Sequence, residues 1–326
     1  MALVLSSNNQ SMRRSRLPDP CDTNPPPAPS FAPPEERPSA PESAAALTLG
    51  IDIGGTGAKL AALAGDKVLW TLKRGYRKPT VDDLVRAIRG ALAGRGDAFD
   101  AVGLCVPGLL DERRERVALS VNVPALMDIR LDDLIAQALG RIPPEFCILN
   151  DSLASGYDVY ATRKLSGRLL VLALGTGVGA AVLDNGVPLA VDNDSPGHIG
   201  QFDVSLEGER VIGPDGGAGS LEGYIGAAAL RQRYGSDPAS KLRAHHAPIR
   251  ALAKAIRICH AMYRPQHIVL AGGLGIRLAG ILPGLRKHVE TRLTSIARPD
   301  WTLNIGDSDF HAACGAARWA DRKTKP

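Results

Sequence analysis

Two apolar runs joined by a glycine–threonine bend begin the structured part of the sequence. Residues Leu47–Ile53 and Ala58–Ala64 are almost continuously apolar, a pattern typical of strands that are buried in a sheet. A third run, Lys67–Lys73, follows the tight turn at Gly65-Asp66. We therefore predict an antiparallel hairpin that is extended by a third strand.

A second copy of this pattern lies further along the chain. The strands predicted at Leu169–Leu174 and Val178–Leu183 flank another Gly/Thr loop and turn again at Asp184-Asn-Gly186. The loop glycines Gly55 and Gly175 are 120 residues apart. The two hairpins therefore predict two similar lobes that grip a polyphosphate between them.

The remaining apolar positions alternate between helical and strand periods. In Val81–Ala93, for example, Leu84, Val85, Ile88 and Leu92 fall on one helical face. The other predicted helices are 131–139, 152–162, 222–233, 247–262, 276–296 and 311–321, and the other predicted strands are 101–106, 146–149, 267–271 and 301–305. This alternation indicates an α/β fold, and the doubled three-strand opening predicts two mixed sheets that each begin antiparallel.

Composition limits the classes of function. The chain has 326 residues, 44% of them hydrophobic, which is enough for two domains or one large core. Residues 1–45 form a separate tail, because ten of the 24 prolines fall between Pro18 and Pro41, and such a segment is expected to be disordered or extended. The net charge of +5 comes without a basic run interleaved with aromatics, which disfavours nucleic-acid binding.

Cysteine usage and hydropathy favour a cytoplasmic protein. The five cysteines are odd in number, widely spaced and form no C-x-x-C pair, so we expect reduced and mostly buried thiols. No apolar run approaches the roughly 18 residues of a membrane-spanning helix. Met1–Ser7 is too short for the core of a signal peptide.

The first hairpin carries residues suited to phosphate binding. Asp52 ends an apolar strand, where its carboxylate can hold a hydrated Mg²⁺ that also takes phosphate oxygens. Gly54 and Gly55 can adopt positive φ and bring backbone N–H groups close to an anion, with Thr56 at the bend and Lys59 just beyond. An ordinary glycine-rich hairpin is the alternative, since Gly-Gly is a common hairpin turn. The second Gly/Thr hairpin favours phosphate binding.

Six short motifs occur in the order typical of one known family. They are Asp52-Ile-Gly-Gly-Thr56, Pro107-Gly108, Asn122-Val-Pro124, Asn150-Asp151, Leu174-Gly-Thr-Gly-Val-Gly179 and Gly272-Gly273. Together they resemble the ROK family of sugar kinases and sugar-responsive repressors, over the chain from Leu47 to the last helix. The resemblance implies an α/β fold of two ribonuclease-H-like (actin-like ATPase) lobes with mixed sheets around a central cleft. Residues 46–162 with 307–326 would form the smaller lobe, and 163–306 the larger one.

The resemblance also assigns sugar-binding and catalytic roles. Asp151 resembles the family's general base, which takes the proton of the sugar hydroxyl, although Asp is also a favoured helix N-cap. Asn150 and Asn122 resemble residues that hydrogen-bond sugar hydroxyls, and their alternative is turn chemistry. Glu222 resembles a sugar-binding glutamate, and its alternative is stabilisation of the dipole in a first helical turn.

The phosphate-binding residues implied by the resemblance lie in three loops and a strand. They are Asp52, Gly54, Gly55, Thr56, Lys59, Gly175, Thr176, Gly177, Gly272 and Gly273. The last two resemble the loop beneath the adenosine of ATP. An apolar strand followed by Gly-Gly is common, so that motif is weak on its own.

Two stretches depart from the family pattern. Many members carry Glu-x-Gly-His followed by Cys-x-Cys-Gly-x-x-Gly-Cys, whose histidine and cysteines bind structural zinc. Here the matching stretches are His198-Ile-Gly-Gln201 and Gly213–Ser220, so all four ligand positions are changed and we predict no zinc site. His198 and Gln201 stand where the family reads the anomeric end of the sugar, which leaves the sugar open.

These features predict a cytoplasmic, glucokinase-like enzyme that transfers the terminal phosphoryl group of ATP to a hexose, with Mg²⁺. Gly55-Thr-Gly-Ala-Lys59 also resembles the first loop of polyphosphate-dependent glucokinases, so polyphosphate is an alternative donor and an N-acetylhexosamine an alternative acceptor. A sugar-sensing regulator is the alternative of another class, but family repressors carry a helix-turn-helix where this chain has its proline-rich tail. The expected partners are the hexose and the donor, without nucleic acid or membrane, and a homodimer is left open.

Overall fold

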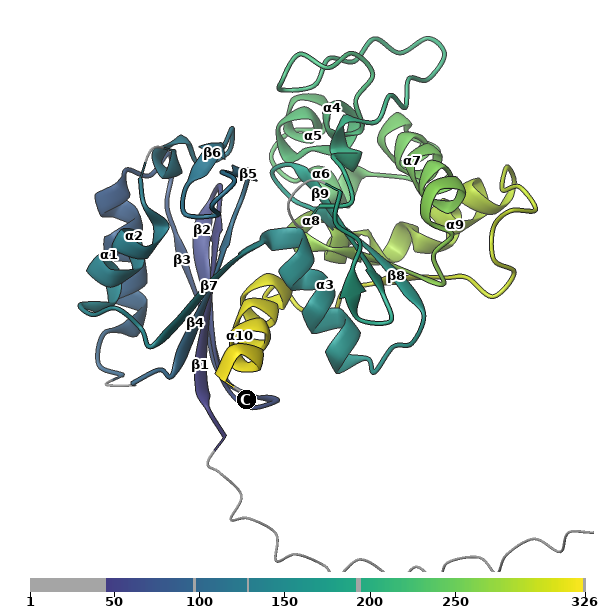
Figure 1. Ribbon diagram of the computed structural model, residues 1–326. Helices are drawn as coiled ribbons and strands as arrows, with labels where there is room; N and C mark the ends of the chain where they lie inside the picture. Colours follow the sequence, from purple (N-terminus) through teal and green to yellow (C-terminus); the bar gives the residue numbers. More distant parts are fainter. Residues whose placement is uncertain (1–44, 96–97, 128, 192–194, 325–326) are drawn as a thin grey trace, which may run out of the picture. The chain divides into compact units, whose positions relative to one another are not determined.

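Two five-stranded mixed sheets form the framework of the protein, as the computed structural model in Figure 1 shows. The structure describes residues 45–95, 98–127, 129–191 and 195–324. The tail predicted at 1–45 therefore lies outside the described residues, apart from Ala45. Residues Ala44–Pro326 group as one unit, and the division into two lobes stays a prediction.

The first sheet has the strand order β3-β2-β1-β4-β7. Its strands are β1 (Leu47–Gly54), β2 (Gly57–Ala64), β3 (Lys67–Gly75), β4 (Ala101–Val106) and β7 (Glu145–Asn150). The pairs β1–β2 and β2–β3 are antiparallel, whereas β1–β4 and β4–β7 are parallel. The prediction of a mixed sheet that begins antiparallel is confirmed.

The second sheet repeats this plan with the order β10-β9-β8-β11-β12. Its strands are β8 (Arg168–Leu174), β9 (Val178–Asp184), β10 (Val187–Pro188), β11 (His267–Ala271) and β12 (Thr302–Ile305). Again the first two pairings along the chain are antiparallel and the later ones parallel. The sequence analysis identified each of these strands except the short β10.

Helices cover both sheets and connect them. Helices α1 (Val81–Leu92) and α2 (Leu131–Leu139) lie on one face of the first sheet, and α10 (His311–Thr324) packs on β1, β2 and β4 (Figure 1). Helix α3 (Asp151–Thr162) packs on β8, β9 and α10. One apolar cluster, which includes Leu153, Val171 and Ala312, therefore joins the two sheets through α3 and α10.

The remaining helices lie between the strands of the second sheet along the chain, and several short elements lie in the loops. The helices are α4 (Leu221–Ile225), α5 (Ala227–Tyr234), α6 (Pro238–Lys241), α7 (Ala247–Tyr263), α8 (Gly272–Gly275) and α9 (Leu282–Glu290). The short elements are β5 (Leu109–Leu110), β6 (Val117–Leu119) and the 3₁₀ turns η1 (Pro124–Leu126), η2 (Ile199–Gln201) and η3 (Ile276–Ile281). Within the described residues, no helix is long and apolar enough to cross a membrane.

Two helix predictions were wrong in their extent. The helix predicted at 222–233 is broken at Gly226, whose backbone is extended (φ −62°, ψ 149°), so α4 and α5 are separate. The helix predicted at 276–296 begins as the 3₁₀ turn η3 and is α-helical only over Leu282–Glu290. Pro283 lies in the first turn of α9, where its missing N–H is tolerated, and this fixes the start of the α-helix.

Candidate active site

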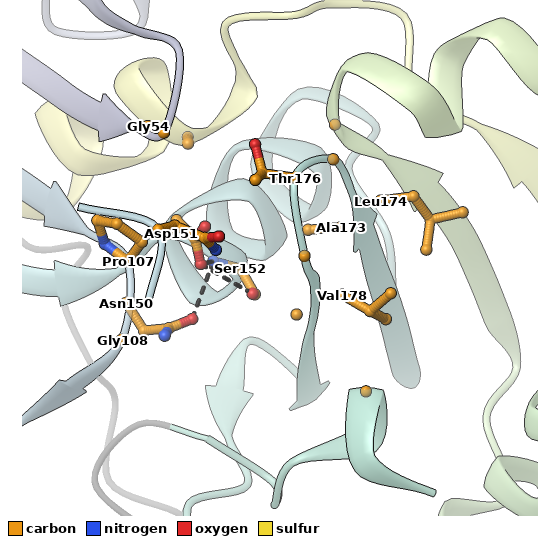
Figure 2. A pocket seen from close by; sticks show the side chains of 18 of the residues that line it. Gly54, Pro107, Gly108, Asn150, Asp151, Ser152, Ala173, Leu174, Thr176 and Val178 are labelled. Atoms are coloured by element: carbon orange, nitrogen blue, oxygen red, sulfur yellow. Dashed lines mark hydrogen bonds between the residues drawn. The ribbon is translucent and has the colours of Figure 1, made fainter. Parts of the chain in front are cut away.

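All sixteen residues predicted to bind phosphate or sugar line one cavity of about 510 Å³, part of which is shown in Figure 2. They are Asp52, Gly54, Gly55, Thr56, Lys59, Asn122, Asn150, Asp151, Gly175, Thr176, Gly177, His198, Gln201, Glu222, Gly272 and Gly273. The fold thus brings together residues from both sheets and from the segments that connect their strands. Their individual roles stay predictions.

The two Gly/Thr hairpin loops meet inside this cavity. A Cβ atom on Gly55, between β1 and β2, would lie 3.2 Å from Oγ1 of Thr176, between β8 and β9. Neither Gly54 nor Gly55 is among the glycines with positive φ, so the expectation of positive φ at this bend was wrong. A side chain at position 55 would crowd Thr176, because the two loops approach each other closely.

Asp52 is a buried acid that forms an ion pair with Lys59. It lies at the end of β1, opposite Lys59 on β2, and the Lys59 Nζ atom is 3.8 Å from Oδ2 of Asp52. Burial raises the pKa of Asp52 to about 6; Lys59 lowers it, and the nearby carboxylates of Asp151 and Asp309 raise it further. A buried carboxylate beside the two Gly/Thr loops fits a hydrated Mg²⁺, which prefers one or two carboxylates plus phosphate oxygens.

Asp151 is the first residue of helix α3, and its neighbour Asn150 caps that helix. The side chain of Asn150 accepts a hydrogen bond from the backbone N–H of Ser152 at 2.9 Å (Figure 2). The alternative interpretation of Asp151 as the N-cap is therefore wrong. Oδ1 of Asp151 accepts the Ser152 N–H at 2.7 Å and its hydroxyl at 3.1 Å. Burial raises the pKa of Asp151, and the hydrogen bonds from Ser152 offset part of this rise.

Glu222 connects helix α4 to the second loop. Its Oε2 accepts the backbone N–H of Val178 at 2.9 Å, directly after the loop glycines. On the other side of the helix break, the N–H of Ala227 donates to the carbonyl of Gly175 at 3.1 Å. Burial raises the pKa of Glu222, and the Val178 N–H offsets part of that rise. The second loop is thus held from both sides by the α4–α5 segment.

Gly272 brings the end of β11 beneath the second loop. Its φ is +78°, a conformation that favours glycine, and a Cβ atom there would lie 2.5 Å from the carbonyl oxygen of Leu174. Gly273 follows in α8 and is exposed to the cavity. No other residue type fits the close contact at position 272 without moving the backbone.

The remaining predicted sugar-binding residues lie near these loops. Asn122 is half-buried, and its Nδ2 lies 3.3 Å from the position that a Cβ atom on Gly177 would take. His198 and Gln201 are exposed on the cavity wall, where His198 precedes the 3₁₀ turn η2 and Gln201 is its last residue. Asn122 is therefore placed between the two loops, while His198 and Gln201 lie at the cavity surface.

The stretch that matches the family's zinc motif is closed by backbone hydrogen bonds. The N–H of Gly213 donates to the carbonyl of Gly217, and that of Gly219 to Val211, both at 2.8 Å. In the described part of the chain, no group of three or more His, Cys, Asp or Glu side chains is placed to hold a metal ion.

Several polar residues of the cavity were not predicted from the sequence, among them Lys73, Asp309 and His311. Asp309, just before α10, contacts Lys59 and Lys73, and His311 begins α10. Asp309 is 250 residues from Lys59 in the chain, so no local motif links them. The last strand and the last helix were both predicted. The ionisable residues between them were the available signal for this part of the cavity.

Two mixed sheets of the same plan, with paired hairpin loops that line one cavity, form a ribonuclease-H-like (actin-like) α/β fold. The sequence profile of the ROK family matches residues 48–323, and the chain therefore belongs to the ROK family.

Three similar proteins illustrate the match. An N-acetyl-D-glucosamine kinase of Erwinia tasmaniensis is 28% identical over 302 residues, which span 82% of this chain and 97% of the relative. A ROK family glucokinase of Streptomyces griseus, solved with glucose and AMPPNP, is 21% identical, with a TM-score of 0.70 over 85% of this chain and 99% of the other. An inorganic polyphosphate/ATP-glucomannokinase of Arthrobacter sp. strain KM is 22% identical, with a TM-score of 0.62 and the same coverage.

Proposed function

We propose that the protein is a sugar kinase that transfers the terminal phosphoryl group of ATP to a hydroxyl group of a hexose. The observation that carries this proposal is the position of Asp151, a carboxylate with a raised pKa in the same cavity as both phosphate loops. The family match and the kinase names of the similar proteins support the same class of reaction.

In the proposed reaction, Asp151 acts as the general base. As the sugar oxygen bonds to the γ-phosphorus, the bond from that phosphorus to the bridging oxygen of ADP breaks, and the hydroxyl proton moves to Asp151. The products are a hexose phosphate and ADP. A base of this kind contributes about 10²- to 10⁴-fold to the rate. A raised pKa suits the role, because it improves the affinity of the carboxylate for the proton.

The donor phosphates would lie between the two hairpin loops. The backbone N–H groups of Gly55 and Gly177, the Thr176 hydroxyl and the Lys59 ammonium group offer donors and positive charge there. Asp52 would hold the Mg²⁺, which when bound neutralises charge on the donor phosphates.

The acceptor sugar would contact Glu222, Asn122 and Asn150, with His198 and Gln201 at the mouth of the cavity. The similar proteins include a glucokinase and an N-acetyl-D-glucosamine kinase, which supports glucose and N-acetylglucosamine as the first acceptors to test. Polyphosphate is the second donor to test, since a similar structure carries that donor in its name. A cytoplasmic location stays a prediction of the sequence, and a homodimer stays open.

A coupled kinase assay of the purified chain tests the proposal. The panel pairs glucose, mannose, N-acetylglucosamine and N-acetylmannosamine with ATP and with polyphosphate, and Asp151→Asn serves as the control for contaminating kinases. We expect turnover with at least one pair, lost in the control. If calorimetry shows sugar binding but no pair turns over, the protein is a sugar-sensing regulator and the kinase proposal fails.

A further inference from the structure

Asp309 contacts two lysines on the wall of the cavity. Its Oδ1 accepts a hydrogen bond from Nζ of Lys59 at 2.9 Å, and its Oδ2 accepts one from Nζ of Lys73 at 3.2 Å. Lys59 on β2 and Lys73 on β3 are direct cross-strand partners. One carboxylate therefore spans both ammonium groups on the same face of the sheet.

Lys59 lies between two acids and is closer to one of them. Asp52 is its cross-strand partner on β1, but the Lys59–Asp52 distance is 3.8 Å against 2.9 Å for Lys59–Asp309. Lys59 therefore makes its shorter contact, a hydrogen-bonded ion pair, with Asp309 and a longer ion pair with Asp52.

Buried groups on two helices fix the position of Asp309. Two residues further on, His311 is 3% exposed, and its Nδ1 lies 2.6 Å from Oδ2 of Asp158 on α3. Its Nε2 is 3.2 Å and 3.3 Å from the backbone nitrogens of Asp307 and Ser308. Asp309 is therefore held by the α3–α10 packing rather than by a free loop.

We propose that Asp309 is a positioning residue for the phosphoryl donor, which holds Lys59 away from Asp52 and aligns it with Lys73 toward the terminal phosphates. The inference rests on the proposed kinase function. Without the Asp309 carboxylate, Asp52 is the remaining ion-pair partner of Lys59, and the 3.8 Å pair between them would shorten and occupy the carboxylate that the Mg²⁺ would need.

This role and simple charge balance predict opposite effects on donor binding when the Asp309 carboxylate is removed. Removing an anion from a phosphate site should tighten the binding of a polyanion, with or without metal. If Asp309 instead keeps Lys59 from moving closer to Asp52, its removal reduces the gain in donor affinity that Mg²⁺ provides. The ratio of the donor Kd without Mg²⁺ to the donor Kd with Mg²⁺ separates the two roles.

The test measures that ratio by calorimetry with AMPPNP in the parent, Asp309→Asn and Asp309→Glu. We expect the ratio to fall about tenfold or more in Asp309→Asn, since a hydrogen bond to a charged group is at stake, and to recover at least in part in Asp309→Glu. The Kd for the sugar should stay within about twofold. Asp300→Asn, which removes an exposed acid from its ion pair with Arg298, is the matched control and should change neither value.

A double-mutant cycle with Lys59→Met tests the route through Lys59. If Asp309 acts by holding Lys59, Asp309→Asn has no further effect on the ratio in the Lys59→Met background. The inference is overturned if the ratio is unchanged in Asp309→Asn and AMPPNP binds more tightly both with and without Mg²⁺. In that case Asp309 only balances the charge of the lysines. A parent that binds neither AMPPNP nor a sugar overturns the proposed function instead.

Discussion

The backbone N–H of Val178 donates a hydrogen bond to the carboxylate of Glu222 at 2.9 Å, which ties the second Gly/Thr loop to helix α4. Glu222 was predicted to bind the sugar, and Val178 is the first residue of β9, directly after that loop. If the loop binds the donor as proposed, the same acid connects sugar binding to the geometry of the donor site.

We expect Glu222→Ala to lower kcat/KM for the donor by about tenfold to a hundredfold, because the Val178 N–H loses a charged acceptor worth about 1.5–3 kcal/mol. Glu222→Gln keeps an acceptor oxygen and should lose less. Steady-state kinetics at saturating sugar measure both. Glu290→Ala, on the exposed side of α9, is the control, and parental kinetics in Glu222→Ala would show that the hydrogen bond is dispensable.

Asp151→Asn should lower kcat by at least about 10²-fold, because an amide cannot take the hydroxyl proton. The melting temperature should change little, since Asn150 rather than Asp151 caps α3. Asn150→Ala is the contrasting variant, and loss of the cap should cost it about 1 kcal/mol of unfolding free energy. Parental turnover in Asp151→Asn would remove Asp151 from the role of base.

Asp52→Asn should stabilise the fold near neutral pH while it abolishes activity. The pKa of Asp52 is about 6 in the folded protein against an ordinary value of 3.8, so the native state holds the proton more tightly than the unfolded state. The parent is therefore relatively most stable below pH 3.8 and loses unfolding free energy as the pH rises to about 6. This difference corresponds to about 3 kcal/mol, which the amide would recover.

Urea unfolding of the parent and Asp52→Asn at about pH 7 and about pH 4 measures this effect. The stabilisation should be present at the higher pH and nearly absent at the lower one. Parental kcat/KM should show the opposite trend and fall as the pH drops through about 6, because a protonated Asp52 cannot hold Mg²⁺. Asp309→Asn is the control of opposite sign, since the pKa of Asp309 is lowered by its lysines and its ionised form stabilises the fold.

The two sheets and most of the cavity could be predicted because their signals are local. Apolar runs interrupted by Gly/Thr bends identify the hairpins, and the candidate residues lie where those strands end. The alternation of strands and helices indicates an α/β fold, and pairing of the strands in such a fold brings their ends together.

The features that the sequence could not predict depend on tertiary contacts. The apolar period runs through Gly226, and the helix breaks there where the Ala227 N–H bonds to the Gly175 carbonyl. Asn150 and Asp151 are both favoured caps, so sequence alone cannot choose between them. Asp309 meets Lys59 across 250 residues, and no periodicity records that contact.

We expect the purified protein to hold no stoichiometric zinc, because the loop Gly213–Ser220 lacks the family's cysteine ligands and is closed by its own backbone hydrogen bonds. A zinc-selective chelator should leave the melting temperature unchanged. EDTA should abolish activity, and added Mg²⁺ should restore it, since kinases need metal on the donor phosphates. Elemental analysis is the direct measurement, and one tightly bound zinc per chain would contradict the interpretation of this loop.

The last prediction concerns sugar selectivity at His198, an exposed residue of the cavity wall beside η2. The family's glutamate at this position only accepts hydrogen bonds, whereas a neutral imidazole offers one donor and one acceptor. Gln201 likewise replaces a ring nitrogen with an amide that carries both functions. A mismatched hydroxyl contact in a polar site can cost several powers of ten in discrimination. We therefore expect looser selectivity around carbons 1 and 2, so that glucose, mannose and glucosamine compete.

Measurement of kcat/KM for these three sugars and N-acetylglucosamine, in the parent and in His198→Glu, tests this expectation. The substitution should change the ratios among the sugars, because it restores an acceptor-only group beside the reducing end. His245→Glu, at an exposed histidine that does not line the cavity, should leave the ratios as they are. Equal ratios in the parent and His198→Glu would mean that His198 packs in its loop and does not contact the sugar.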